Sequence, residues 1–263
     1  MKLDPFDLPE SLYEFAQISS FPSVIDSLAQ LAENEDWDYH NTPSQYKNPI
    51  LHNYINNTYK RLAIEKKFAY SADKKSCCFD TGLTSRNHHE PIYMMFIENT
   101  NPAVDCYWFF NKFFRKGESE VNRFDKLPEM AFYWDDPSKL VFDSRKDLIV
   151  NVEHIIQDNK QRFPIPYNTM PDYNLQNYVN GCIEAMKTKL RRNYKIAVPQ
   201  YFITTGVIQL LLPLCLASQD IADLAIVVED YGSIYRASTC LTLDMAINNA
   251  RLVAKPDRDW LNP

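Results

Sequence analysis

The chain has 263 residues, of which 24% are charged and 45% hydrophobic, and its formal net charge is −6. A protein with this excess of acidic residues lacks the generally basic surface that gives non-specific affinity for nucleic-acid phosphates. Any nucleic-acid site must therefore be a local basic patch. With only five glycines, the chain is also a poor candidate for glycine-rich phosphate loops or flexible linkers, whereas its length suffices for a buried core.

Two helices and a group of strands are predicted in the first half of the chain. Apolar side chains recur at spacings of three and four in residues 22–32 and again in residues 49–66, which predicts two amphipathic helices. Residues 77–97 place apolar runs on both sides of a polar turn, and this pattern predicts a β-hairpin of half-buried strands. Residues 106–114 (CYWFFNKFF) are a further strand candidate.

The second half is predicted to hold two helices, a β-meander and a final short helix. The two helices are expected over residues 145–163 and 175–192. The strands of the meander are expected at residues 197–203, 207–216, 223–229 and 233–240. Pro199 and Pro213 indicate edge or bulged positions, because proline cannot donate to a strand ladder. The Thr242 hydroxyl can cap a helix that begins at the next residue.

Together these elements predict a single α+β domain over residues 1–263. N-terminal and central helices are expected to pack on an antiparallel β-sheet, with the C-terminal meander followed by a short helix. No internal repeat and no low-complexity linker divides the sequence, so one continuous domain is favoured over two.

The sequence is typical of a cytoplasmic protein that does not enter a membrane. The N-terminal stretch MKLDPFDLPESLYEF lacks the basic segment and apolar run of a secretory signal. The longest apolar run, residues 207–217, is interrupted by Gln209 and Pro213 and is far shorter than the roughly 20 residues that a membrane helix needs. None of the six cysteines forms a CxxC pair, and most lie in apolar runs, so reduced thiols are expected.

Several long stretches carry a resemblance to one family. In the last third they are NYKIAVPQYF, IQLLLPLCL, ADLAIVVED and YRASTCLTLDMAINNARLVAKPDRDWL, and earlier in the chain FDTGLTS and HIIQDNKQRFP fit the same pattern. With these specific motifs, nearly the whole chain resembles the family catalogued as domain of unknown function 3825. The family carries no established reaction. It resembles modules found beside RNA-binding domains in larger proteins, which implies a context of RNA metabolism.

One candidate catalytic group lies on the predicted third helix. Common catalytic and cofactor signatures, including GxxxxGK[ST], GxGxxG, GxSxG and HExxH, are absent, so no cofactor is predicted and enzymatic activity stays open. His154, Asp158 and Arg162 are spaced at i, i+4 and i+8, and a His–carboxylate pair beside an arginine can bind or protonate a phosphate. A solvated helix face with i,i+4 charge pairs is the favoured alternative, because such faces are commoner than perturbed sites.

The polar turn of the predicted hairpin contains two adjacent histidines. His88, His89 and Glu90 carry donor atoms that suit a metal ion. Adjacent residues in a turn rarely converge on one ion, and the sequence shows no third partner. An exposed turn is therefore favoured, and no metal site is predicted.

A polar stripe is predicted on the last helix. Asp244, Asn248 and Arg251 are spaced at i, i+4 and i+7, and Lys255 and Asp257 follow in a proline-containing loop. Asparagine is a mediocre helix former, so a pair of asparagines within a helix calls for a reason beyond propensity. Amides that recognise a base edge or a ribose are one reason. A hydrogen-bond ladder that ties the helix to the meander is an equal alternative.

The densest basic run lies at the end of the predicted fourth helix. Basic groups interleaved with aromatic rings suit single-stranded RNA, through phosphate contacts and base stacking. A cationic helix end that complements the helix dipole is the alternative. The side chains concerned are Lys187, Lys189, Arg191, Arg192 and Lys195, with Tyr194 and Tyr201 nearby.

Three functional hypotheses follow. The leading one is a binding module for single-stranded RNA or a nucleotide, which uses the basic run and the polar stripe of the last helix. The second is a metal-independent phosphoesterase or nucleotide hydrolase, with His154 as acid or base and Arg162 on the phosphate. The third is a protein-interaction module or homodimer, in which residues 233–240 form an open strand edge unless the final helix or the strand at residues 106–114 covers them.

Overall fold

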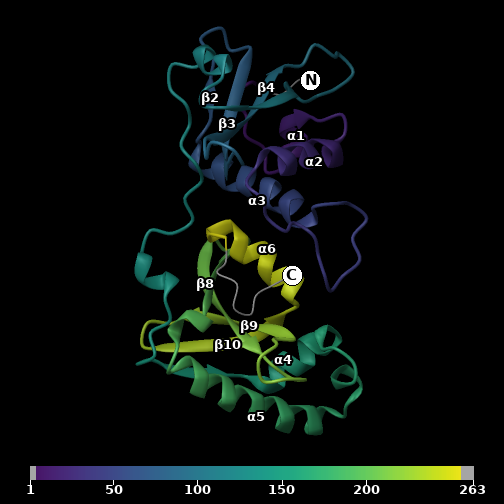
Figure 1. The fold of residues 1–263 in the computed structure, drawn as a ribbon, viewed down its shortest axis with the longest axis vertical. Helices are drawn as coiled ribbons and strands as arrows, with labels where there is room; N and C mark the ends of the chain where they lie inside the picture. Colours follow the sequence, from purple (N-terminus) through teal and green to yellow (C-terminus); the bar gives the residue numbers. More distant parts are fainter. Residues whose placement is uncertain (1–3, 256–263) are drawn as a thin grey trace. The chain divides into compact units, whose positions relative to one another are not determined.

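The computed structural model describes residues 4–255 (Figure 1). These residues form two compact units. Unit 1 contains the described residues up to Tyr39 together with Ser44–Phe132, and unit 2 contains His40–Pro43 and the described residues from Tyr133 onward. Each unit has its own five-stranded sheet, so the α+β class is confirmed, although the helices pack on two sheets. The single domain over residues 1–263 stays a prediction, since two compact units can still fold cooperatively.

Unit 1 begins with three helices, α1 (Leu12–Phe15), α2 (Phe21–Leu31) and α3 (Pro49–Glu65). The helices predicted at residues 22–32 and 49–66 are confirmed to within one residue at each end. Both α2 and α3 carry proline in the first turn, where its missing N–H costs nothing. Helix α3 ends where Lys66 adopts a left-handed conformation with φ of 55°.

The sheet of unit 1 has the strand order β1-β5-β4-β3-β2. Its strands are β1 (Ala16–Gln17), β2 (Ala69–Tyr70), β3 (Ser76–Thr84), β4 (Pro91–Glu98) and β5 (Trp108–Arg115), followed by the short 3-10 helix η1 (Ser119–Arg123). The β3–β4 hairpin and the β5 strand confirm the predictions at residues 77–97 and 106–114. Because β1 pairs with β5 in parallel, the sheet is mixed.

The strand β3 is irregular between Asp80 and Thr84, where its register with β4 shifts. Gly82 has φ of 74°, and a Cβ at this position would stand 2.5 Å from the Tyr54 hydroxyl, so both backbone conformation and space require glycine. The buried Asp80 carboxylate accepts the Gly82 N–H at 2.8 Å. Burial raises the pKa of this carboxyl from its usual 3.8 to about 6, although the Gly82 N–H opposes the shift.

The sheet of unit 2 has the strand order β6-β10-β9-β8-β7. Its strands are β6 (Asp147–Val150), β7 (Val198–Phe202), β8 (Val207–Leu214), β9 (Leu224–Asp230) and β10 (Ile234–Leu241). Strands β7 to β10 form the predicted antiparallel meander, with β9 at the centre of the sheet. Pro199 lies on the edge strand β7, as expected. Pro213 lies on β8 beyond Leu211, the last residue that pairs with β7, so β8 has only one neighbour there.

The open edge of this sheet is not where it was predicted. Residues 233–240 correspond to β10, which pairs with β9 on one side and with β6 in parallel on the other. The covering strand comes from residues 147–150, which were assigned to a helix spanning 145–163. The segment Asp147–Val150 is rich in branched apolar residues, and pairing with β10 outweighs its weak helical tendency. The helix α4 (Val152–Asn159) begins only after Asn151, whose side chain caps it.

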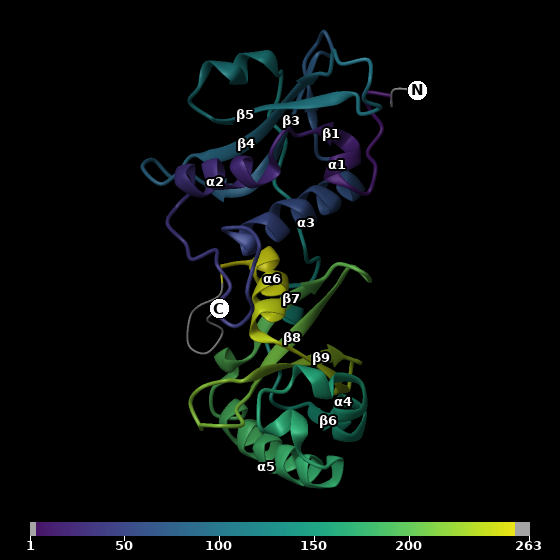
Figure 2. The same ribbon diagram turned by 90° about the vertical axis from the view of Figure 1, so that its right-hand side faces the viewer.

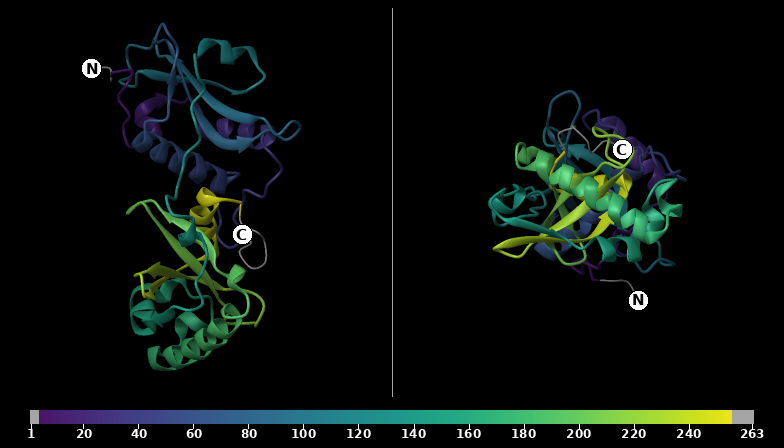
Figure 3. Two further views of the ribbon diagram at one scale, coloured as in Figure 1. Left: turned by 90° about the vertical axis from the view of Figure 1, so that its left-hand side faces the viewer. Right: turned by 90° about the horizontal axis from the view of Figure 1, so that it is seen from below.

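Helices cover both faces of the unit 2 sheet (Figure 1, Figure 2 and Figure 3). Helices α4 and α5 (Asp172–Leu190) pack on one face, where they share an apolar core with alternate residues of the strands. Helix α6 (Leu243–Val253) lies on the opposite face, mainly over β7. The Thr242 side chain accepts the Met245 N–H, which confirms the predicted helix cap.

Unit 2 also contains the 3-10 helices η2 (Pro137–Leu140), η3 (Lys160–Arg162), η4 (Tyr167–Thr169) and η5 (Tyr194–Ile196). All six cysteines are free thiols, and Cys77, Cys78 and Cys240 are buried. Within residues 4–255, no helix combines the length and the apolar character that crossing a membrane demands.

Candidate functional site

The predicted catalytic residues do not form one cluster. His154 Nε2 and Asp158 Oδ2 lie 3.4 Å apart on α4, and their side chains are 48% and 59% exposed. The stripe ends there, because α4 stops at Asn159 and continues as the tighter helix η3. Arg162, in η3, turns toward the sheet and donates to the backbone carbonyl of Cys240. This placement matches the solvated charge pair that the sequence favoured, with Arg162 tying η3 to β10.

The polar stripe of α6 runs from a buried first residue to an exposed end. Asp244 is buried in the first turn of the helix and accepts a hydrogen bond from Asn41 at 3.4 Å. Asn248 and Arg251 follow on the helix and are half-buried, whereas Lys255 lies beyond the helix end and is exposed. Asp257, which was expected to extend this face, is outside the described residues.

A ladder of side-chain amides connects α6 to the meander. Asn249 donates to Gln200 at 3.1 Å, Gln200 donates to Gln209 at 2.8 Å, and Gln209 donates to Glu229 at 2.8 Å. Gln200 and Gln209 are only 1% and 5% exposed, so this chain of bonds satisfies amides that would be costly to bury alone. The ladder therefore accounts for Asn249, one of the two adjacent asparagines in α6.

The basic run and the α6 stripe lie on opposite faces of the unit 2 sheet and do not converge. Most members of the run are engaged close to their own helix. Lys187 pairs with Glu184 at 2.8 Å, Lys189 donates to the carbonyl of Gln219, and Arg192 donates to the carbonyl of Thr188. Only the Arg192 bond goes to a carbonyl of the helix end, as expected of a cationic C-terminus, whereas Lys187 forms an i,i+3 ion pair and Lys189 reaches a neighbouring loop.

The aromatic neighbours of the run differ in accessibility. Tyr194, in η5, is 53% exposed and could stack with a base, and Lys195 beside it is exposed. Tyr201 is buried and packs edge-to-face on Tyr133, with ring centroids 4.9 Å apart. Only Tyr194 of the two is therefore available to a ligand.

Two members of the basic run line a cavity of about 320 Å³, which we call the cationic pocket. Lys187, in the last turn of α5, and Arg191, the residue directly after the helix, line the pocket from one side. Lys146 faces it from the segment before β6. The pocket is completed by Glu184, Asp147 and Ser144 and by the apolar side chains Phe142, Leu148, Ile149, Leu190 and Ile234. Lys146 is not apparent as a site residue from the sequence, because the pattern of its segment predicts a helix.

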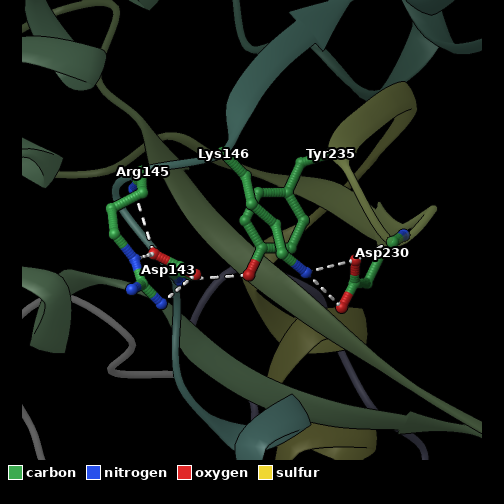
Figure 4. Close-up of polar contacts among 6 residues, drawn as sticks. Asp143, Arg145, Lys146, Asp230 and Tyr235 are labelled. Carbon is green, nitrogen blue, oxygen red and sulfur yellow. Dashed lines mark hydrogen bonds and ion pairs between the residues drawn. The ribbon is translucent and has the colours of Figure 1, made fainter.

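A network of polar contacts fixes the Lys146 side of the pocket (Figure 4). The Lys146 ammonium bonds to both carboxylate oxygens of Asp230, at 2.7 and 2.9 Å, and lies 4.9 Å from the centroid of the Tyr235 ring. The Tyr235 hydroxyl accepts the Asp143 N–H at 3.0 Å. These contacts join the loop before β6 to β9 and β10, so Lys146 is held in place before any ligand arrives.

The network also sets the charge states at the pocket rim. Two parallel bonds of 2.8 Å from Arg145 hold the pKa of the Asp143 carboxyl down at about 2. The hydrogen bond to Asp230 raises the pKa of Lys146. Lys146 is therefore a cation throughout the physiological range. The signal in the sequence was the charged segment Asp143–Ser144–Arg145–Lys146 directly before an apolar strand.

The turn with adjacent histidines is exposed, as favoured by the sequence. His89 Nδ1 lies 2.5 Å from Glu33 Oε1, and the two side chains are 75% and 45% exposed. Within residues 4–255, no three histidine, cysteine or acidic side chains are positioned to hold a metal ion together.

Comparison with known proteins identifies one family. A family model described as a domain of unknown function, DUF3825, matches residues 28–260. No curated protein and no solved structure gives a significant match to the chain. The family match runs through both units and covers nearly the whole sequence, so the chain belongs to the DUF3825 family.

Proposed function

We propose that this protein is a binding module for a nucleotide or for a phosphate-bearing end of single-stranded RNA. The observation that supports this function is the cationic pocket, in which Lys187 and Arg191 of α5 and Lys146 of the distant loop line one cavity. A cluster of cations around a small cavity suits phosphate oxygens, and arginine can bind two of them at once. Asp147 and Glu184 lower the net positive charge of the pocket, which favours a ligand with few phosphates over a long duplex.

Arg191 is the side chain on which the proposal depends most. Lys146 and Lys187 are each paired with a carboxylate, whereas the Arg191 guanidinium has no hydrogen bond or ion pair within the described part of the chain. It can therefore engage a phosphate without first giving up an internal partner. The apolar side chains of the pocket, among them Ile149 with 51% of its surface exposed, offer a wall for a ribose or base.

Fluorescence anisotropy with labelled short RNA and with a labelled mononucleotide tests this function at two salt concentrations. We expect Arg191→Ala to weaken binding by about tenfold and to lower the salt slope by about 1. The neighbouring Arg192→Ala removes the same charge from the same helix end, but its guanidinium donates to the Thr188 carbonyl, so binding should change less than about twofold. Absence of binding at low salt, or equal losses in the two variants, overturns the proposal.

The open edge of β6 supports self-association as a second candidate function. The Asn151 N–H donates to the Ala237 carbonyl, so in this parallel pair the N–H groups of Leu148 and Val150 point away from β10. Two copies could pair through these edges. Val150→Pro removes one outward N–H and leaves the bonds to β10 intact. Light scattering should then show a dimer for the wild type and a monomer for the variant, and a monomeric wild type removes this candidate.

A further inference from the structure

A second cavity, separate from the cationic pocket, lies along another side of α5. It has a volume of about 920 Å³ and is formed by α5, the segment of residues 213–219 and Ile196. We call it the α5 groove. Its walls are mainly apolar, with Tyr178, Ile196, Pro213 and Leu216 among them. The volume lies within the roughly 300–1,000 Å³ typical of small-molecule sites.

The floor of the groove contains a glycine that the fold does not explain. Gly181 lies in the middle of the 19-residue helix α5, where glycine is less favourable than alanine. A Cβ at this position would meet no atom within 4 Å, so close packing does not require its absence. Gly181 and Ala185, one turn later, leave a flat and bare strip of helix that faces the groove.

The opposite wall is held rigidly. The Asp223 carboxylate accepts the N–H groups of Leu216 and Ala217, at 2.6 and 3.0 Å. The Tyr178 hydroxyl donates to the Leu216 carbonyl at 2.5 Å, and its ring stacks on Tyr167. Because these bonds fix the wall relative to α5, the groove exists before any ligand binds.

The charged side chains that line the groove are already engaged within the chain. Glu184 pairs with Lys187, and Lys189 donates to Gln219 and lies 3.4 Å from Asp220, so both charges at the rim are compensated within the chain. Cys182 and Cys215 also line the groove, and burial raises the pKa of both thiols, which keeps them neutral. A charged ligand would gain little here, whereas an apolar one would be buried favourably.

We propose that the α5 groove binds a neutral, flat, largely apolar small molecule, with a ring of the ligand resting on the bare strip at Gly181 and Ala185. The inference is independent of the phosphate site, because its residues, apart from Glu184, do not line the cationic pocket. The inference about the α5 groove would therefore still hold if the protein bound neither RNA nor a nucleotide.

Prodan, a neutral naphthalene dye whose emission shifts in apolar surroundings, is the probe. The wild type should bind it saturably. Gly181→Leu places a side chain on the floor of the groove and should weaken the affinity by about tenfold, equivalent to roughly 1.4 kcal/mol. Asn180→Leu adds the same side chain to the same helix outside the groove, since Asn180 is exposed and does not line it, and should leave binding unchanged. Absence of saturable binding, or equal effects of the two variants, overturns the proposal.

Thiol protection locates the dye independently. Bound prodan should slow the alkylation of Cys182 and Cys215, measured by mass spectrometry, and should not slow that of Cys106, a half-buried thiol of unit 1. Equal protection of all three overturns the assignment.

The role of Gly181 is tested by thermal unfolding and by sedimentation. Gly181→Ala should raise the midpoint by roughly 2–4 °C, because it removes the cost of a helical glycine. A lower midpoint would show that the fold needs this glycine. A wild-type dimer that Gly181→Leu dissociates would show that a second copy fills the groove, and would likewise overturn the proposal.

Discussion

The two faces of the unit 2 sheet are built differently, although each is covered by helix. Strand β8 shows the contrast, because its Leu210, Leu212 and Leu214 enter the apolar core under α4 and α5. On the other face, Gln209 of the same strand belongs to the amide ladder that leads to α6. One face is held by apolar packing and the other, in part, by a chain of directional bonds.

This difference shows that polar residues at helical spacing have two distinct fates in one unit. On α6, Asp244 is buried against Asn41, and Asn249 beside the stripe begins a ladder of amides whose partners are fixed by the fold. On α5 the basic residues stay at the surface, where Arg191 remains open to a ligand. Burial therefore separates the internal amides of α6 and the meander from the exposed basic residues of α5, and the residue type alone does not.

The largest expected effect comes from breaking the ladder. Gln209→Met keeps the length of the side chain but leaves the buried Gln200 amide without its acceptor, and should lower the free energy of unfolding by about 1–3 kcal/mol. Urea denaturation measures this change. Arg192→Ala, on the exposed end of α5, should stay within about 0.5 kcal/mol of the wild type. Equal losses in the two variants would contradict the contrast between the faces.

The double variant Gln200→Met with Gln209→Met sharpens the same comparison. Replacing both partners of a buried hydrogen bond by apolar side chains is often nearly neutral, because neither is left unsatisfied. The loss in the double variant should thus be smaller than the sum of the two single losses. Additive losses would show that the amides do not act as a ladder.

Asp80 in unit 1 is a buried carboxyl group, and its hydrogen bond from Gly82 does not offset the cost of burying its charge. Its pKa in the folded protein is about 6, against a usual 3.8, so the folded state binds the proton more tightly than the unfolded state. Ionisation of Asp80 therefore lowers the free energy of unfolding. This loss of stability is absent below pH 3.8, grows as the pH rises and is complete above pH 6. Asp80→Asn keeps an acceptor for the Gly82 N–H and should stabilise the protein at pH 8 by up to about 3 kcal/mol.

The pH dependence of the free energy of unfolding tests whether ionised Asp80 destabilises the fold. Urea unfolding at pH 4 and pH 8 should show a larger gain for Asp80→Asn at pH 8 than at pH 4. A gain that is equal at the two values would mean that ionisation of Asp80 does not limit stability.

Most helices and strands could be predicted, because their signals are local. The apolar spacing of residues 49–66 and the turn between β3 and β4 are both complete within a short segment. Strand β6 could not be predicted in this way, since four residues carry little local preference and their state depends on pairing with residues of β10 that lie 87 positions later in the chain. The two-unit arrangement likewise arises from contacts between distant segments.

Only part of the cationic pocket could be predicted from the sequence. The basic run at the end of α5 drew attention to Lys187 and Arg191, which do line the cationic pocket. Lys146 was missed because its position opposite α5 follows from the placement of β6. Conversely, Arg162 continued the α4 stripe in the sequence but not in the structure, because the helix tightens after Asn159.

The smallest effect is expected at the surface pair of α4. His154 and Asp158 are about half exposed and 3.4 Å apart, and such i,i+4 pairs contribute roughly 0.2–0.5 kcal/mol. Asp158→Asn should therefore lower the free energy of unfolding by no more than about 0.5 kcal/mol, and high salt should remove most of the difference. Hydrolysis of dinucleotides and capped RNAs by His154→Ala provides the functional counterpart. If the pair is only a solvated contact, this variant will match the wild type on every substrate. A rate loss of a hundredfold or more, the usual effect of removing a general acid or base, would instead show that α4 carries chemistry.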